Sequence, residues 1–272
     1  MRVLERISCI NFVEKDGYAF FSNQFYNGLF RVEIKTGRTD FLGSFENERI
    51  SRRNIHKEIF LENRKIYFCP RRGRHIHIYD LIDTTIQAVE LRSKSEKPFL
   101  IEEVVVEGDN IYFVPDQKDC AIRKFNRKTF LLTQTNEKNG FYGQYLSQNK
   151  EIFPASGLMK EYPIEYGLRD DFWGKWETDE VWYGFLPMGR QIIKYIKNRN
   201  RLEIMPLALT DRKNFKRYLW KVKMELMKDG IVSEEEISFR DWLSITVQGE
   251  IQKQKGFRSN CIGNNMWKLE KE

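Results

Sequence analysis

The chain has 272 residues, of which 41% are hydrophobic and 14% aromatic, and this composition excludes a disordered protein. Its length suits one large β domain or two small domains. The formal net charge of +7 favours anionic partners such as nucleic acid, an acidic glycan or an anionic membrane surface. A solvated surface that happens to be basic accounts for the charge equally well.

Cysteine usage and the first residues predict where the protein works. Cys9, Cys69, Cys120 and Cys261 are scattered, without a CxxC pair or a metal-ligand spacing, which is typical of reduced thiols in a cytosolic protein. Residues 1–6 (MRVLER) carry charges where a secretory signal peptide needs an apolar core. No apolar run approaches the ~20 residues of a membrane span. We therefore expect a soluble, cytoplasmic protein.

A short aromatic motif recurs along the first 210 residues. It reads YAFF at 18–21, KIYFCP at 65–70, NIYFVP at 110–115 and EVWY at 180–183. A shift of 47 residues places Phe21 on Phe68, and a shift of 70 places Tyr112 on Trp182. The stretch between the last two copies leaves room for a degenerate copy, best matched by residues 150–154. A repeat of this period predicts a repeat-built β protein.

Each repeat divides into about four short strands. In the third repeat we expect strands at 102–107, 110–114, 121–126 and 130–135, because β-branched and aromatic runs alternate there with turn-forming residues. Such a unit resembles a blade of the β-propeller repeat superfamily, of the broad kelch or WD-repeat kind. The resemblance is one of period and pattern, without a closing Trp-Asp dipeptide or a Gly-Gly doublet. It implies a small, about five-bladed β-propeller over residues 1–210, with a β-sandwich or another array of hairpins as the alternative.

Residues 211–272 change character and predict a short C-terminal α-helical extension packed on the β domain. Asp211 can cap a helix in which Phe215, Leu219, Val222 and Leu226 follow at helical spacing. A capping box at 233–236 predicts a second helix through 243, and residues 260–272 are a candidate third helix. We expect the apolar stripe and the tryptophans at 220, 242 and 267 to be packed, because exposing them is costly. Contact of the basic first helix with a partner or a membrane surface is the alternative.

The strongest binding signal is a group of arginines. In a propeller, the hairpin between the second and third strands of a blade opens on the same face as the link that enters the blade. This places three arginines of the second hairpin beside three of the preceding link: Arg71, Arg72, Arg74, Arg49, Arg52 and Arg53. Guanidinium groups bind carboxylate, sulfate or phosphate in bidentate fashion. Solvated loop charges are the alternative interpretation.

Two tryptophans are further candidates for binding. Trp173 and Trp176 surround Gly174 and follow two aspartates, which predicts a loop from which they could stack on sugar rings or bases. Trp182 takes the place of Tyr67 and Tyr112 in the repeat, so we expect it in the core.

Catalytic and metal-binding signals are weak. His75 and His77 project from the same face of a strand, which suits metal binding. No third ligand lies at a recognised spacing, so we interpret both histidines as ordinary strand residues. No metal or cofactor is predicted. No nucleophile elbow, P-loop, dinucleotide fingerprint or HExxH motif is present. Glu102 and Glu103 are adjacent on a strand, so they point to opposite faces.

These features predict a non-catalytic interaction module that presents a basic propeller face to a protein or an acidic polymer such as an acidic glycan. A glycan hydrolase or lyase at the propeller channel is the first alternative. Nucleic-acid binding, suggested by the pI of about 9.1 and the basic helix, is the second.

Overall fold

A computed structural model describes residues 7, 9, 11–93, 95–96, 99–117, 120–135, 151–152, 171–172, 175–185, 191–229, 257–263 and 266–271. The chain forms two compact units. The larger is Ile7–Thr210, and the smaller combines Met1–Arg6 with Asp211–Glu272. The helical extension was predicted to pack on the β domain, and this packing stays a prediction.

The first sheet is an antiparallel meander with one added strand. Asp16 and Gly17 have φ angles of 52° and 80°, the left-handed pair that a tight hairpin needs between its first two strands. The last strand of the larger unit pairs in parallel with the fourth, Ala208 opposite Arg38. The strands are β1 (Val13–Lys15), β2 (Tyr18–Ser22), β3 (Leu29–Glu33), β4 (Arg38–Gly43) and β19 (Ala208–Leu209).

The second sheet has two deeply buried central strands. All six residues of its third strand are buried, as are the last five of its second strand. These two central strands therefore pack on both faces, whereas the two edge strands are only partly buried. In order, they are β5 (His56–Glu62), β6 (Lys65–Pro70), β7 (His75–Asp80) and β8 (Ile86–Glu90).

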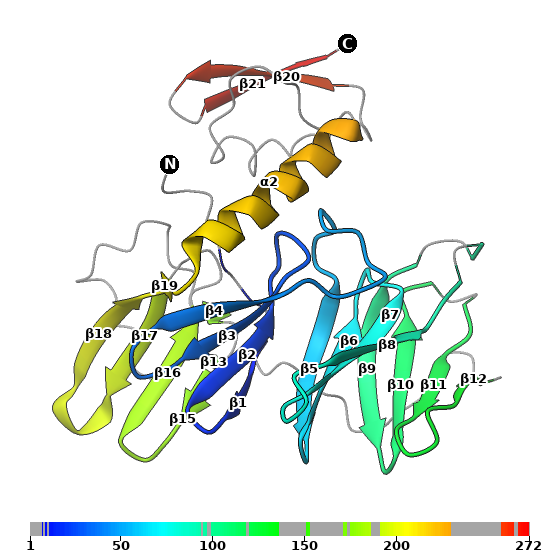
Figure 1. Ribbon diagram of the computed structural model, residues 1–272, viewed down its shortest axis with the longest axis horizontal. Helices are drawn as coiled ribbons and strands as arrows, with labels where there is room; N and C mark the ends of the chain where they lie inside the picture. The colour runs from blue at the N-terminus through cyan, green and yellow to red at the C-terminus, as the bar shows by residue number, and fades with distance from the viewer. Residues whose placement is uncertain are drawn as a thin grey trace. The chain divides into compact units, whose positions relative to one another are not determined.

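The third sheet matches the strands expected from the sequence to within a few residues. Gly108, at a φ of 52°, lies in the turn of its first hairpin. Its strands are β9 (Ile101–Glu107), β10 (Asn110–Pro115), β11 (Arg123–Asn126) and β12 (Leu132–Gln134). One apolar cluster joins the second and third sheets, with Ile76 and Ile78 packed among Ile111, Phe113 and Phe125. The two sheets lie side by side in Figure 1.

The last part of the larger unit contains a two-stranded sheet and a fourth meander. The first pairs β13 (Glu151–Ile152) with β14 (Asp171–Phe172), at the position of the degenerate repeat. The meander follows, with a short η1 (Lys197–Arg199) between its last strands. Its strands are β15 (Lys175–Glu177), β16 (Val181–Phe185), β17 (Gln191–Ile196) and β18 (Arg201–Pro206). The predicted all-β class of the repeat region is confirmed.

The described residues of the smaller unit form one helix and one pair of strands. Helix α2 (Arg212–Lys228) begins where Asp211 accepts a hydrogen bond from the Asn214 amide at 3.0 Å, so the predicted cap and helix are confirmed. Its stripe of Phe215, Leu219, Val222 and Leu226 is buried. Among the described residues no helix is long and apolar enough to cross a membrane.

Two expectations for this region were wrong. In place of the third helix predicted at 260–272, the described residues form two antiparallel strands, β20 (Phe257–Gly263) and β21 (Met266–Lys271). A helix there would have to run through Gly263 and two asparagines, all poor helix formers that favour a turn. Trp220 is 60% exposed rather than packed. The second predicted helix, 233–243, lies outside the described residues.

Candidate functional site

The structure brings the six predicted arginines to one end of the second sheet. Arg49, Arg52 and Arg53 lie in the link between β4 and β5, whereas the other three lie in the β6–β7 hairpin. Backbone hydrogen bonds join these segments: the amides of Arg71 and Gly73 donate to the Ile55 carbonyl at 2.6 and 3.1 Å. The link and the hairpin therefore form one continuous surface.

Gly73 permits this close approach. A Cβ atom at residue 73 would lie 2.9 Å from Ile55 Cγ2 and 3.2 Å from Glu48 Oε1, inside normal contact distance. A larger residue here would force Ile55 and Glu48 to shift, so glycine lets the hairpin lie this close to the link.

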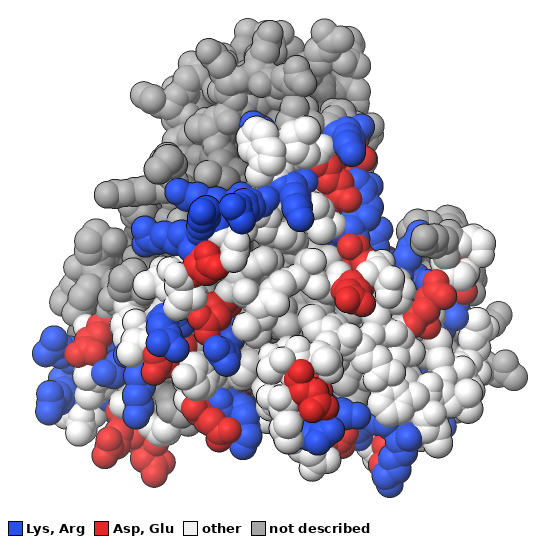
Figure 2. Space-filling model, viewed as in Figure 1, with Lys and Arg blue, Asp and Glu red and all other residues white. Residues whose placement is uncertain are grey.

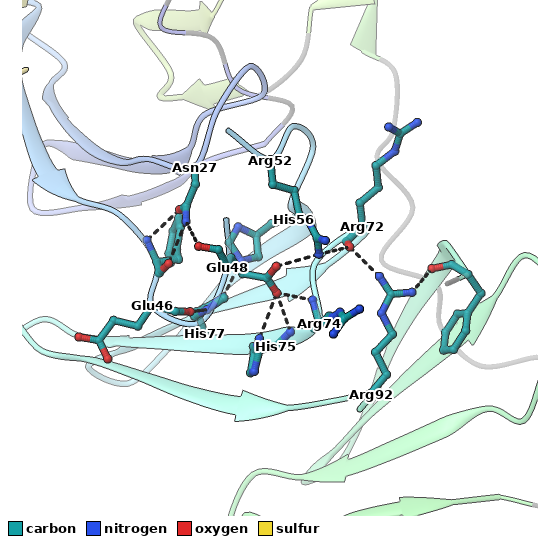
Figure 3. A network of polar contacts seen from close by, with 12 residues as sticks. Asn27, Glu46, Glu48, Arg52, His56, Arg72, Arg74, His75, His77 and Arg92 are labelled. Carbon is teal, nitrogen blue, oxygen red and sulfur yellow. Dashed lines mark hydrogen bonds and ion pairs between the residues drawn. The ribbon is translucent and has the colours of Figure 1, made fainter. Parts of the chain in front are cut away.

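Glu48 is the anion around which the arginines are arranged (Figure 3). Its side chain is 1% exposed. Its carboxylate accepts hydrogen bonds from Arg52 Nη1 at 2.9 Å, from the His75 amide and ring Nδ1 at 3.1 Å each, and from the Arg74 amide. Burial raises the pKa of Glu48, but the bonds from His75 and Arg74 and the charge of Arg52 outweigh burial, so the pKa lies below its usual value. Glu48 is therefore an anion at neutral pH.

Arg92 is a seventh member that the sequence reasoning missed. It follows β8 in the link that leaves the second sheet, and it is 7% exposed. Its guanidinium donates to the Arg72 carbonyl at 2.6 Å and to the Phe99 carbonyl, and it lies 5.0 Å from the Phe99 ring centroid. The link that leaves the sheet lies at the same end as the link that enters it, and this position is the signal that points to Arg92.

We call these seven residues the arginine cluster: Arg49, Arg52, Arg53, Arg71, Arg72, Arg74 and Arg92. Arg52 and Arg92 both donate to the Arg72 carbonyl, which holds their guanidinium groups in place. The Arg72 guanidinium instead extends away from Glu48 (Figure 3), and Arg49 and Arg72 are exposed. The cluster thus has a fixed inner layer and an exposed outer layer.

Positive charge is crowded in the inner layer. Burial lowers the pKa of Arg92, and the charges of Arg52 and Arg74 lower it further, whereas Glu48 and Glu96 act in the opposite direction. An added anion at this end of the sheet would relieve the repulsion.

All three histidines of the chain meet beneath the cluster. His56 Nε2 lies 2.9 Å from His77 Nδ1, and the rings of His75 and His77 are 5.9 Å apart, so the predicted shared face is confirmed. The Glu46 carbonyl can only accept, so His77 Nε2 carries the proton at 2.9 Å. His77 Nδ1 then accepts from His56 Nε2, and His56 Nδ1 accepts from the Ser22 hydroxyl at 2.8 Å.

This chain of hydrogen bonds requires both rings to be neutral. Burial, then the charge of His77, lowers the pKa of His56 well below its usual value. Burial lowers the pKa of His77 to about 4, although its bond to the Glu46 carbonyl acts in the opposite direction. Both nitrogens of each ring are engaged. Within the described ranges no group of three or more His, Cys, Asp or Glu side chains could hold a metal ion.

The predicted loop around the two candidate tryptophans is wrong at Trp176, and their binding role stays a prediction. Trp176 lies in β15, not in a loop, and its backbone pairs with Tyr183 of β16. The alternation of Lys175, Trp176 and Glu177 suits a strand, and pairing with β16 stabilises it. Trp173 lies outside the described residues. Trp182 is 1% exposed, as predicted for a core residue.

Other charged groups lie away from the arginine cluster. Glu102 is exposed and faces Lys57 at 3.9 Å, while its neighbour Glu103 is half-buried. A cavity of about 340 Å³ lies at the opposite ends of the second and third sheets. Two cations of its lining form ion pairs with lining acids, Arg127 with Glu62 at 2.5 Å and Lys128 with Asp109 at 2.9 Å. Acids of its own lining therefore already pair with these two cations.

No protein-family model matches the chain, and no curated protein matches it. Among solved structures it is similar to the nidogen/laminin complex, with 10% identity, a TM-score of 0.35, and coverage of 74% of this chain and 80% of that one. It is also similar to extracellular domains of B. thetaiotaomicron proteins described as one-component and hybrid two-component systems. These show 14% and 12% identity and TM-scores of 0.33 and 0.31, covering 76% and 74% of this chain but only 22% and 25% of theirs.

The comparison with these domains contradicts the prediction of a cytoplasmic protein, which is not retained. That prediction rested on the charges in residues 1–6, the scattered cysteines and the lack of a long apolar run. At these TM-scores the likeness carries no argument about activity, partner or blade number, and it does not place this chain outside the cell.

Proposed function

We propose that this protein is a non-catalytic binding module whose arginine cluster binds an acidic partner, either a protein surface rich in carboxylates or an acidic glycan. The observation that carries the proposal is the convergence of arginines from three separate segments, the two links and the β6–β7 hairpin, on one end of the second sheet. Glu48 and backbone carbonyls fix Arg52 and Arg92, so little conformational entropy remains to be lost when an anion binds.

We further propose that the larger unit is a small β-propeller. Successive four-stranded meanders support this architecture, as does the shared apolar cluster of the second and third sheets. The pairing of β19 with β4 also supports it, because it joins the two ends of the larger unit. The Thr210 hydroxyl donates to the Asp40 carboxylate at 2.7 Å, a contact that would close a ring of blades.

Binding to acidic glycans provides the direct test. The purified chain is titrated with heparin and with a uronic-acid polymer, and complex formation is followed by fluorescence anisotropy at increasing salt. We expect binding that weakens as salt rises, because guanidinium contacts with sulfate and carboxylate are screened. Reversal of two exposed members of the cluster, R49E/R72E, should weaken binding at least tenfold.

A matched control separates the cluster from general basicity. Arg38 and Arg201 have side chains 57% and 62% exposed on the same unit, so R38E/R201E removes the same charge elsewhere. Equal loss in both double variants would refute a site at the cluster. Capture of a protein partner by the wild type but not by R49E/R72E, with no glycan bound, would assign the cluster to a protein surface.

A further inference from the structure

Helix α2 has one buried face and one basic face. The buried face consists of Phe215, Leu219, Val222 and Leu226, none more than 4% exposed. The opposite face follows from spacings of three and four residues. Its members are Lys213, Arg217, Trp220, Lys221, Met224 and Lys228, all of them exposed. Figure 2 shows Lys and Arg side chains following the helix.

The charge along this helix is almost entirely positive. Between residues 212 and 228 there are seven basic residues and one acid, Glu225, which is half-buried. Lys213, Arg217 and Lys221 succeed one another at a spacing of four, where like charges repel and destabilise a helix. A solvated helix gains nothing from such an arrangement, whereas a helix that contacts a polyanion does.

An aromatic ring lies within this basic face. Trp220 is 60% exposed, and Lys223 Nζ lies 5.1 Å from its ring centroid. Met224, 38% exposed, is next to it on the helix surface. Exposing a tryptophan costs free energy, and a ring flanked by cations is the arrangement on which nucleobases stack.

The buried stripe decides between two kinds of anionic partner. A helix that lies in a membrane surface inserts a continuous apolar face, but in α2 that face is already buried. What remains exposed is a row of cations with one large aromatic ring. The cations can contact phosphates while the ring stacks on a base only if the bases are unpaired, as they are in single-stranded nucleic acid.

We propose that the exposed face of α2 binds single-stranded nucleic acid, with Lys213, Arg217 and Lys221 contacting phosphates and Trp220 stacking on a base. This site is separate from the arginine cluster, because its residues lie on a different element and in the smaller unit. It adds a second anionic ligand to the one proposed for the cluster.

The test measures fluorescence anisotropy of a labelled 20-nucleotide oligo(dT) with the full chain between 50 and 200 mM salt. Each phosphate contact on a single strand contributes about −0.7 to the slope of log K against log salt. K213Q/R217Q/K221Q should therefore weaken binding at least tenfold and reduce the slope by about 2. W220A should weaken binding roughly fivefold or more without changing the slope, because stacking releases no counterions.

The control removes the same charge at exposed positions of the larger unit. R38Q/K128Q/R201Q should bind oligo(dT) within twofold of the wild type, since the side chains are 57%, 75% and 62% exposed and lie outside α2. Circular dichroism checks that each variant is folded. R49E/R72E should retain oligo(dT) binding, which distinguishes failure here from failure of the glycan proposal.

Three results would overturn the proposal. One is no binding of oligo(dT) at 50 mM salt, and another is equal weakening in the control and in the α2 triple variant. The third is binding to phosphatidylserine vesicles but not to oligo(dT), which would assign the basic face to a lipid surface.

Discussion

Glu48 is the residue on which the arrangement of the cluster depends. Its carboxylate is almost fully buried and accepts four hydrogen bonds from the link, the hairpin and β7. A buried anion of this kind is costly unless every oxygen is satisfied, and here three residues supply the donors. The glutamate thus connects the two loops that carry the arginines.

Glu48→Gln should be strongly destabilising. The amide keeps the shape of the side chain but loses the charge that compensates Arg52, and it points a donor at other donors. Breaking a buried charged contact typically costs about 3 kcal/mol or more in the free energy of unfolding. Urea denaturation at pH 7.5 measures the loss. Glu46 is an exposed acid in the same loop, so Glu46→Gln should change the free energy of unfolding by less than about 0.5 kcal/mol. Equal effects of the two substitutions would contradict this role of Glu48.

At the scale of elements, the short β19 has an effect larger than its two residues suggest. It adds a parallel edge to the first sheet, with the Ala208 amide donating to the Gly37 carbonyl at 3.0 Å and the Thr210 amide to Thr39 at 2.9 Å. These bonds connect positions about 170 residues apart, so they remove much conformational freedom from the folded unit.

Ala208→Pro tests this strand. Proline removes the amide donor to Gly37, and it should lower the free energy of unfolding by about 1–3 kcal/mol. Ala208 is exposed, so the added ring meets no core residue. Ala208→Ser keeps the amide and should match the wild type in the same urea titration. If both variants are as stable as the wild type, the parallel pairing does not hold the ends of the unit together.

At the scale of the whole molecule, two buried neutral histidines couple stability to pH. The pKa of His77 falls to about 4 and that of His56 is also lowered, whereas in the unfolded chain both titrate near the usual 6.5. Below pH 6.5 the unfolded state therefore binds more protons than the folded state, and the free energy of unfolding decreases as the pH is lowered. Above that value neither state is protonated and the effect vanishes.

The free energy of unfolding should therefore decrease by about 2 kcal/mol per histidine between pH 7.5 and pH 5. This window lies above the range in which Glu48 and Asp40, with their lowered pKa values, take up protons. Urea titrations at several pH values measure the profile. His77→Gln should lose about half of the slope, and a flat wild-type profile between pH 7.5 and 5 would show that the histidines are not buried in neutral form.

The sequence alone predicted the elements whose signals are local. The third sheet follows from alternation and turn residues, and α2 follows from Asp211 and the spacing of its apolar stripe, because neighbours along the chain determine both patterns. The positions of the second hairpin and of the link before it likewise predict six of the seven cluster arginines at one end of a sheet. Prediction from the sequence failed at residues 260–272, where turn formers outweigh a weak helical pattern, and at Trp176, where pairing with β16 overrides a loop-like flank.

Only the tertiary structure decided what those elements bring together. Arg92 joins the cluster from a third segment, and His56 of β5 meets His77 of β7 across 21 residues. In the sequence, Glu48 is one acid among several, and its burial depends on the hairpin that packs over it. Trp220 looks like a core residue in the sequence, but in the structure it lies outside the buried stripe of α2. Contacts between distant segments depend on which strand ends share an edge, and burial depends on what covers a side chain; neither is encoded in the spacing of nearby residues.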